Sequence, residues 1–352
     1  MKNRIVIMAL IFALLISSAS VFAQGEGEAS QTYEVRMPTA EAEGDFMTVW
    51  AKNFADYMSD ESDGRWNIQV FPYGTLGEND NIPELAQMGV VEFVFADYGW
   101  LSGFVPQTNT LALHYIWPKD NLPEILEWVN KNGKFMALME EKYRENDLVP
   151  LGIFYEGWQW LTSKQPIDDL SDLVGLKTRI MASNMLAKDY SAYGIDPTPM
   201  AYGEIYSGLQ TGLIDAQSQP MFANYSMGFY EVSDYFVQLW AEPFLGIPCV
   251  NKSFFDSLSE EDQAMIRGYW QDVVAESAVW IQAKNDEMKE EIAQKRPEIS
   301  FKELTEDEIA TLRGLAETKV YPEFPSIGGE DSAMMLEVLK QDVADAQAAL
   351  GL

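Results

Sequence analysis

Hydrophobic and polar positions along the first third of the chain follow two different periods. Residues 33–37 and 66–71 alternate one by one, as half-buried strands do, whereas residues 46–58 carry apolar side chains at helical spacing. A short helix is expected at 82–88 and a third, mostly apolar strand at 90–95. This order of strand, helix, strand, helix, strand predicts a parallel sheet with crossover helices.

The same pattern begins again near residue 149. Strands are expected at 151–155, 176–181 and 214–217, and helices at 184–193 and 202–211 lie between them. In a chain of 352 residues, such a restart indicates two α/β lobes. Clefts between domains are where small ligands usually bind, and hinge closure around the ligand is the expected motion.

The C-terminal part of the sequence is strongly helical. Ser259 is expected to cap a helix, with Asp262 in the acidic position of a capping box. A long helix is then expected from 265 to about 294, and shorter helices at 305–318 and 331–348.

The first 23 residues have the features of a secretory signal. Lys2 and Arg4 precede an uncharged apolar run at 5–16, and Ala23 ends the segment, so cleavage is expected between Ala23 and Gln24. The alternative, a membrane anchor, would need about 20 apolar residues. Residues 24–30 are expected to form a disordered leader. The mature protein is therefore expected to be exported and not embedded in a membrane.

Acidic residues greatly outnumber basic ones. The chain has 55 Asp and Glu against 24 Lys and Arg, which gives a formal net charge of −31. Nucleic acids and anionic lipids are bound through basic clusters, so the composition argues against both as partners. An anionic ligand meets a repelling field and has to be caught by a local, well-placed cation.

The residues that commonly carry catalysis are scarce. His114 is the only histidine and Cys249 the only cysteine, so Ser–His and Cys–His catalysis would both depend on one imidazole in an apolar stretch. No Cys/His spacing typical of zinc, no phosphate-binding loop and no dinucleotide fingerprint is present. We expect no metal and no cofactor. A hydrolase that uses two carboxylates remains a weaker alternative.

Arg179 is the strongest candidate for the cation. It stands near the end of the predicted strand 176–181, and strand ends facing a cleft are where α/β proteins place ligand contacts. Its planar guanidinium can hold a carboxylate with two parallel hydrogen bonds. From spacing alone, a structural ion pair with one of the many acids is an equal alternative.

A series of motifs around Arg179 resembles the DctP-type substrate-binding subunits of tripartite ATP-independent periplasmic (TRAP) transporters. The motifs follow one another in the family's order, and weaker likeness extends over nearly the whole mature chain. They read Gly175-Leu-Lys-Thr-Arg179, Gly194-Ile-Asp-Pro-Thr-Pro-Met200, Glu204-Ile-Tyr206, Asp215-Ala-Gln-Ser-Gln-Pro220 and Phe229-Tyr-Glu-Val232.

The resemblance implies a two-lobed periplasmic-binding-protein-like α/β fold with a ligand cleft and a long helix that spans both lobes. The first lobe is expected to comprise residues 31–153 and about 245–285, and the second 154–244 and about 286–352. The resemblance also implies a periplasmic receptor that captures a small organic acid and delivers it to the TRAP membrane permease subunits. A sensory receptor of the same fold that docks a membrane signalling protein is the main alternative.

The family's binding residues map onto particular positions of this chain. The binding arginine falls on Arg179, an aromatic ring on Tyr202, and an asparagine before proline on Gln219. A second arginine that is common in the family falls on Gln159. Because a second ligand carboxylate would lack a cationic partner, the resemblance implies a monocarboxylate held by Arg179 alone.

Contacts from other segments are expected from position along the chain. Trp158 and Gln159 alternate on a strand, so only one of their two faces meets the ligand, and the family register favours Gln159. Asp97 and Tyr98 follow the third strand of the first lobe and should lie near the cleft. Glu41 stands in the loop before the first helix, where an acid would suit a ligand that also carries an amine or hydroxyl.

Overall fold

Residues 31–76 and 81–352 are described by the structure, which is a computed structural model. The signal peptide and the leader predicted for residues 1–30 lie outside the described residues.

The described strands and helices alternate along most of the chain. The strands are β1 (Tyr33–Pro38), β2 (Trp66–Phe71), β3 (Phe93–Asp97), β4 (Leu148–Pro150), β5 (Phe154–Ser163), β6 (Lys177–Ile180), β7 (Asp196–Pro199), β8 (Ala216–Gln219), β9 (Tyr235–Asn251) and β10 (Ser300–Glu303). The α-helices are α2 (Phe46–Glu61), α3 (Ile82–Gln87), α4 (Tyr98–Leu101), α5 (Leu122–Asn132), α6 (Lys134–Glu145), α7 (Asn184–Ala192), α8 (Ile205–Thr211), α9 (Met221–Ser226), α10 (Lys252–Ser257), α11 (Glu260–Asp272), α12 (Val274–Lys295), α13 (Glu306–Leu315), α14 (Phe324–Ile327) and α15 (Ser332–Leu350). Short 3-10 segments are η2 (Pro106–Ala112), η3 (Leu170–Leu173), η4 (Tyr202–Glu204), η5 (Phe229–Glu231) and η7 (Tyr321–Glu323), and η6 (Ala316–Val320) is a π-helix.

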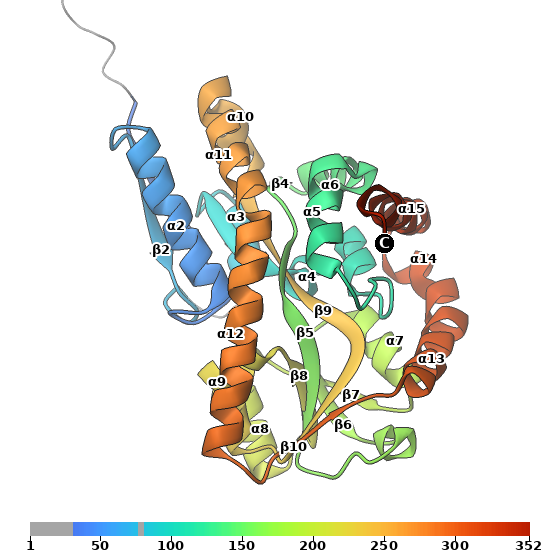
Figure 1. The fold of residues 1–352 in the computed structure, drawn as a ribbon. Coiled ribbons are helices and arrows are strands. Elements are labelled where there is room, and N and C mark those ends of the chain that lie inside the picture. Colours follow the sequence, from blue (N-terminus) through green and yellow to red (C-terminus); the bar gives the residue numbers. More distant parts are fainter. Residues whose placement is uncertain (1–30, 77–80) are drawn as a thin grey trace, which may run out of the picture.

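Two lobes lie one above the other, and β5, β9 and α12 run from one to the other (Figure 1). The end of β9 pairs with β3 and β4, whereas its beginning pairs with β10 and with the end of β5. The β5–β9 ladder shifts register between Tyr155 and Trp158, and again between Trp158 and Trp160. These irregularities lie where the two strands pass between the lobes.

The two-stranded sheet of β1 and β2 is parallel as predicted, whereas the eight-stranded sheet is mixed. β1 pairs parallel with β2, and β6 pairs parallel with β7 and β8. However, β3, β4 and β5 all run antiparallel to β9. The pattern of alternating strands and helices holds within each lobe, but it does not reveal that one late strand returns through both lobes.

Helix α2 shows how the sequence pattern becomes packing. Phe46, Trp50, Phe54 and Met58 recur every four residues and are all buried. The Phe54 ring lies 5.4 Å from the Phe93 ring of β3, nearly edge to face. The Phe46 ring lies 6.1 Å from the Phe95 ring and so holds the N-terminal end of α2 beside the last residues of β3, where the functional acids described below lie.

Several predicted elements are confirmed, two are wrong, and one long strand was not predicted. Helices 46–58, 184–193 and 331–348 correspond to α2, α7 and α15. The strand predicted at 151–155 is largely the connection between β4 and β5, because pairing with β9 and not apolar character sets where these strands begin and end.

The helix predicted from 265 to 294 is two helices, α11 and α12, which meet at Val273. Trp270, Val274 and Ala278 keep their buried four-residue spacing across the break, so periodicity does not reveal it. Strand β9 was not predicted, because Pro243, Gly246 and Pro248 within it are rare in central strands.

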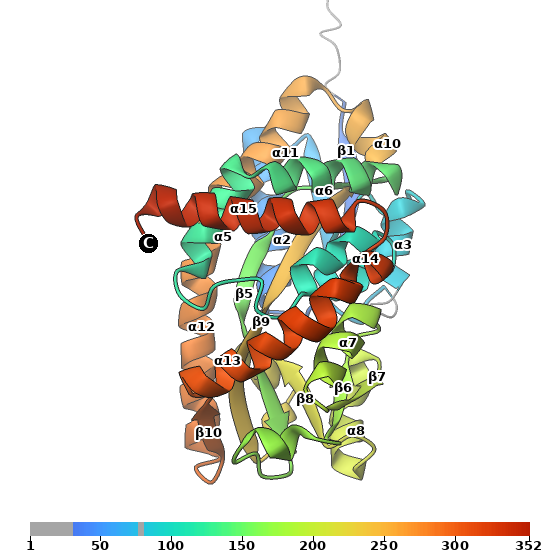
Figure 2. The same ribbon diagram turned by 90° about the vertical axis from the view of Figure 1, so that its right-hand side faces the viewer.

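The C-terminal helix α15 packs against η2, α5 and α6 (Figure 2). Those elements belong to the segment assigned to the first lobe, whereas the sequence placed residues 286–352 with the second. Because of this packing, the lobe boundaries expected from the sequence stay a proposal. Among the described helices, none combines the length and apolar character that a membrane crossing needs.

Ser259 caps α11 as predicted, since its hydroxyl accepts a 3.1 Å hydrogen bond from the backbone N–H of Asp262. The Asp262 carboxylate returns to the cap through Oδ2, which accepts a 2.8 Å hydrogen bond from the Ser259 hydroxyl. It also accepts hydrogen bonds from the Arg65 guanidinium and the Trp66 indole, both at 3.0 Å, and so ties α11 to the start of β2.

Candidate ligand-binding site

Arg179 lies in β6 and is almost fully buried, with 2% of its surface exposed. Parallel pairing with β7 and β8 places β6 inside the second lobe, and its last residues point toward the first lobe. The Nε atom donates a 2.9 Å hydrogen bond to the carbonyl oxygen of Met200, and the guanidinium carbon lies 6.0 Å from the centre of the Tyr202 ring. The side chain is thereby held with its terminal nitrogens beside the inter-lobe cavity.

Both lobes contribute to the wall of this cavity, which encloses about 20 Å³. That volume is enough for about one water molecule and too small for an organic solute, so entry of a ligand requires the lobes to separate. The lining residues are Ala40, Glu41, Asp97, Trp100, Arg179, Met181, Tyr202, Gln219, Ala223 and Phe244. Five of the eight predicted site residues are therefore brought together: Glu41, Asp97, Arg179, Tyr202 and Gln219.

Two acids face Arg179 from the first lobe. Glu41 Oε2 accepts a 2.7 Å hydrogen bond from the Met47 N–H at the start of α2. Asp97 caps α4, and its Oδ1 accepts hydrogen bonds from the backbone N–H groups of Gly99 at 2.8 Å and Trp100 at 3.1 Å. Burial raises the pKa of Glu41 to about 8 and that of Asp97 to about 7. Arg179 acts in the opposite direction on Asp97, because a nearby cation favours the carboxylate.

Two further acids lie directly behind these, and the sequence did not predict them. Glu156 in β5 is fully buried, and its carboxyl pairs with that of Glu41. Burial and the neighbouring Glu41 hold the pKa of Glu156 well above its usual range. Asp45, the N-cap residue of α2, has its pKa raised by burial to about 7. The signal for Glu156 was a lone charge between the apolar run 151–155 and the tryptophans that follow it.

Tyr98 and Gln159 lie behind the cavity and do not line it. Gln159 Nε2 donates a 3.0 Å hydrogen bond to the Tyr98 hydroxyl, which donates to Glu242 Oε2 at 2.7 Å. The Tyr190 hydroxyl also donates to Glu242, and His114 Nε2 lies 3.3 Å from it. His114 is thus a fully buried member of a polar network.

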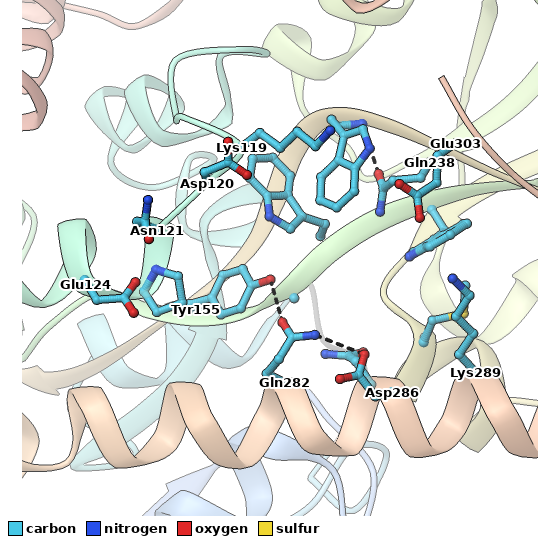
Figure 3. A pocket seen from close by; sticks show the side chains of 17 residues that line it. Lys119, Asp120, Asn121, Glu124, Tyr155, Gln238, Gln282, Asp286, Lys289 and Glu303 are labelled. Carbon is cyan, nitrogen blue, oxygen red and sulfur yellow. Dashed lines mark hydrogen bonds between the residues drawn. The ribbon is translucent and has the colours of Figure 1, made fainter. Parts of the chain in front are cut away.

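Trp158 lies on the other face of β5 from Gln159, because neighbouring residues of a strand point to opposite sides. There it lines a second cavity of about 420 Å³ between β5, β9, α12 and the loop before α5 (Figure 3). The Trp158 ring lies 5.5 Å from Trp240. Lys119 and Lys289 hold their ammonium groups 4.8 Å and 4.5 Å from the rings of Trp240 and Trp160.

Within residues 31–76 and 81–352, no group of three or more His, Cys, Asp or Glu residues is arranged to hold a metal ion. The chemistry of the Arg179 cavity is therefore that of one guanidinium, several carboxyls, an amide and aromatic walls. Such a cavity can bind and orient a small polar molecule between two lobes. It defines the class of the protein, a two-lobed solute-binding protein.

The comparisons agree with this class. Residues 38–324 match the family described as bacterial extracellular solute-binding protein, family 7. The chain is 31% identical over 336 residues to the ectoine/5-hydroxyectoine-binding periplasmic protein UehA of Ruegeria pomeroyi, covering 96% of this chain and 98% of UehA. It is also 31% identical to the ectoine-binding periplasmic protein TeaA of Halomonas elongata, covering 95% and 97%.

A solved structure of the periplasmic ectoine-binding protein from the TeaABC TRAP transporter of Halomonas elongata superimposes with a TM-score of 0.83, covering 88% of this chain and 99% of that one. The chain belongs to the DctP family of TRAP-transporter solute-binding proteins, which capture small organic ligands. Its relatives are substrate-binding proteins of transporters and not enzymes.

Proposed function

We infer that this protein is the periplasmic solute-binding subunit of a TRAP transporter and that its ligand is a small zwitterion with one carboxylate and one cationic group. The ligand carboxylate binds Arg179, and the cationic group binds Glu41 and Asp97. The observation that carries this proposal is that Arg179 and the two acids line one cavity from opposite lobes.

The charges around the cavity favour a zwitterion over a simple anion. A carboxylate that pairs with Arg179 would also lie close to Glu41 and Asp97, and unpaired buried charges of like sign are costly. A cationic group on the same ligand offsets this repulsion. A dicarboxylate is disfavoured further, because Gln159 takes the position of the family's second arginine and does not line the cavity.

The remaining walls suit a small, flat ring. Trp100, Tyr202 and Phe244 present aromatic surfaces, and the Tyr202 ring also meets the Tyr73 ring of the first lobe edge to face at 5.5 Å. Gln219, 3% exposed, adds an amide at one end. Ectoine, a cyclic amino acid with a carboxylate and a cationic amidine, has this combination of groups, and the relatives UehA and TeaA are named for binding it.

Closure of the two lobes on the ligand gives the membrane permease a liganded form to recognise. The relatives are periplasmic proteins of transporters, and the predicted signal peptide fits the same location. We accordingly propose delivery to a permease and no catalytic turnover of the ligand.

Isothermal titration calorimetry on the purified mature protein tests the proposal. Ectoine and 5-hydroxyectoine should bind more tightly than succinate, sialic acid or a cyclic monocarboxylate without a cationic group. Arg179→Ala should abolish binding while preserving the circular dichroism spectrum. The control Arg36→Ala removes an exposed guanidinium paired with Glu92 and should leave ectoine affinity unchanged. Preferential binding of a ligand without a cationic group would overturn the zwitterion assignment.

A further inference from the structure

The buried carboxyls of Glu41 and Glu156 form a pair beside the Arg179 cavity. Among the described residues, the oxygens of Glu156 have no partner other than the Glu41 carboxyl, to which the Glu156 carboxyl donates. Room for the Glu156 carboxyl depends on Gly246 of β9, since a Cβ added there would lie 2.0 Å from Glu156 Oε1. Glu156 does not line the cavity, so it acts on a ligand only through Glu41.

Charged and titratable groups face this pair from every element packed around it. Four carboxyls lie within this buried region, and two basic groups, Arg179 and Lys284, act on them. The groups are Asp45 at the start of α2, Asp97 at the end of β3, Arg179 in β6, Tyr202 in η4 and Lys284 in α12. Burial disfavours ionisation of all four carboxyls at once, and two carboxyls that share a site hold one proton between them.

We propose that the Glu41–Glu156 pair exchanges its shared proton for the cationic group of the ligand, so that ligand capture releases one proton and Glu156 is the positioning residue that creates this exchange. Without ligand, one carboxyl of the pair is neutral and donates to the other, and the pair carries one negative charge. With the cationic group bound, both carboxyls are ionised and the proton passes to bulk water. The net charge of the pair and its bound cation is the same as before.

The exchange makes affinity depend on pH. Burial and the neighbouring Glu41 hold the pKa of Glu156 well above its usual range, so the pair keeps its proton at neutral pH and must give it up on binding. Release of one proton means that the association constant rises with pH, by up to about tenfold per pH unit. This inference rests on the proposed zwitterionic ligand.

Calorimetry with ectoine as the probe measures the released protons directly, since titrations in phosphate and in Tris differ by the ionisation enthalpy of the buffer. At pH 6.5 the wild-type protein should release about one proton per ectoine bound, and this number should fall as the pH is raised. In Glu156→Gln the amide can donate to an ionised Glu41, so ectoine should still bind, with a proton release near zero and little pH dependence.

Asp342→Asn is a matched control, because Asp342 is another buried carboxylate, bonded to the Phe135 N–H on the remote α15 side. It should release as many protons as the wild type. Ectoine binding by the wild type without proton release would overturn this inference alone, and so would unchanged release in Glu156→Gln. Absence of ectoine binding at every pH would overturn the proposed function together with the inference. If Glu156→Gln does not fold, the wild-type proton number decides.

Discussion

The hydroxyl of Ser226 donates a 2.8 Å hydrogen bond to Asp45 Oδ2. Ser226 ends α9 in the second lobe, and Asp45 caps α2 in the first, so this bond crosses the mouth between the lobes. The edge-to-face contact of Tyr73 with Tyr202 crosses at the same side. Both contacts join the two closed lobes, and neither Ser226 nor Asp45 lines the ligand cavity.

Removal of this bond should therefore weaken binding modestly. Ser226→Ala is expected to lower ectoine affinity about two- to tenfold, corresponding to the loss of roughly 0.5–1.5 kcal/mol for one hydrogen bond. Calorimetry gives the affinity, and small-angle scattering should show a larger open fraction at subsaturating ligand. Ser207→Ala, whose hydroxyl bonds within its own lobe, should behave as the wild type. An equal effect of the two substitutions would argue against the inter-lobe role.

Two of the three aromatic residues predicted for the site, Tyr202 and Trp158, should differ in effect. Tyr202→Ala removes a wall of the cavity and the ring beside Arg179, and it should weaken ectoine binding by about five- to thirtyfold, or roughly 1–2 kcal/mol. Trp158→Phe alters the opposite face of β5 and should change affinity less than threefold. Competition titrations on both variants measure the difference, and a larger effect of Trp158→Phe would contradict the placement.

Gly246 should be intolerant of any side chain. Gly246→Ala places a methyl group against Glu156 Oε1 and 2.8 Å from the Phe95 ring, so the free energy of unfolding should fall by about 1–3 kcal/mol. Urea denaturation measures this loss. Gly314→Ala in α13 has nothing within 4 Å of the added Cβ, and it should instead raise stability by roughly 0.5–1 kcal/mol. Similar values for the two variants would show that the space beside Glu156 is not tight.

The buried acids should make the unliganded protein less stable as pH rises. Burial raises the pKa of Glu41 from 4.5 to about 8 and that of Asp97 from 3.8 to about 7, so the folded protein holds more protons than the unfolded chain in this window. The free energy of unfolding should therefore decline between about pH 4.5 and pH 8. Urea midpoints at four pH values measure the slope, which Glu41→Gln should flatten. A rise in stability across the window would be inconsistent with neutral buried carboxyls.

The sequence predicted the second-lobe half of the site better than the first. Arg179, Tyr202 and Gln219 lie in a continuous set of motifs, and Glu41 and Asp97 follow from their places at the ends of elements. Glu156 could not be predicted, because its role depends on two strands and a glycine 90 positions later in the sequence meeting in space.

Gln159 illustrates a different limit. Alternation along the strand correctly separated it from Trp158, but periodicity does not say how far a side chain stands from a cavity. Tyr98 and Glu242 occupy the intervening layer, and both come from other elements. The long strand β9 supplies Glu242 and Phe244. It was not predicted because it contains prolines, so the position of Glu242 next to Tyr98 could not be predicted either.

The chain passes between the lobes along β5 and β9, where Gly157 has a φ of +116° and Trp240 a φ of +53°. The tryptophan-lined cavity, which Trp158, Trp160 and Trp240 line, lies at this crossing, on the other side of β5 from the Arg179 cavity. Three of the ten tryptophans line the tryptophan-lined cavity, so their intrinsic fluorescence should respond to movement of β5 and β9 when the lobes open or close.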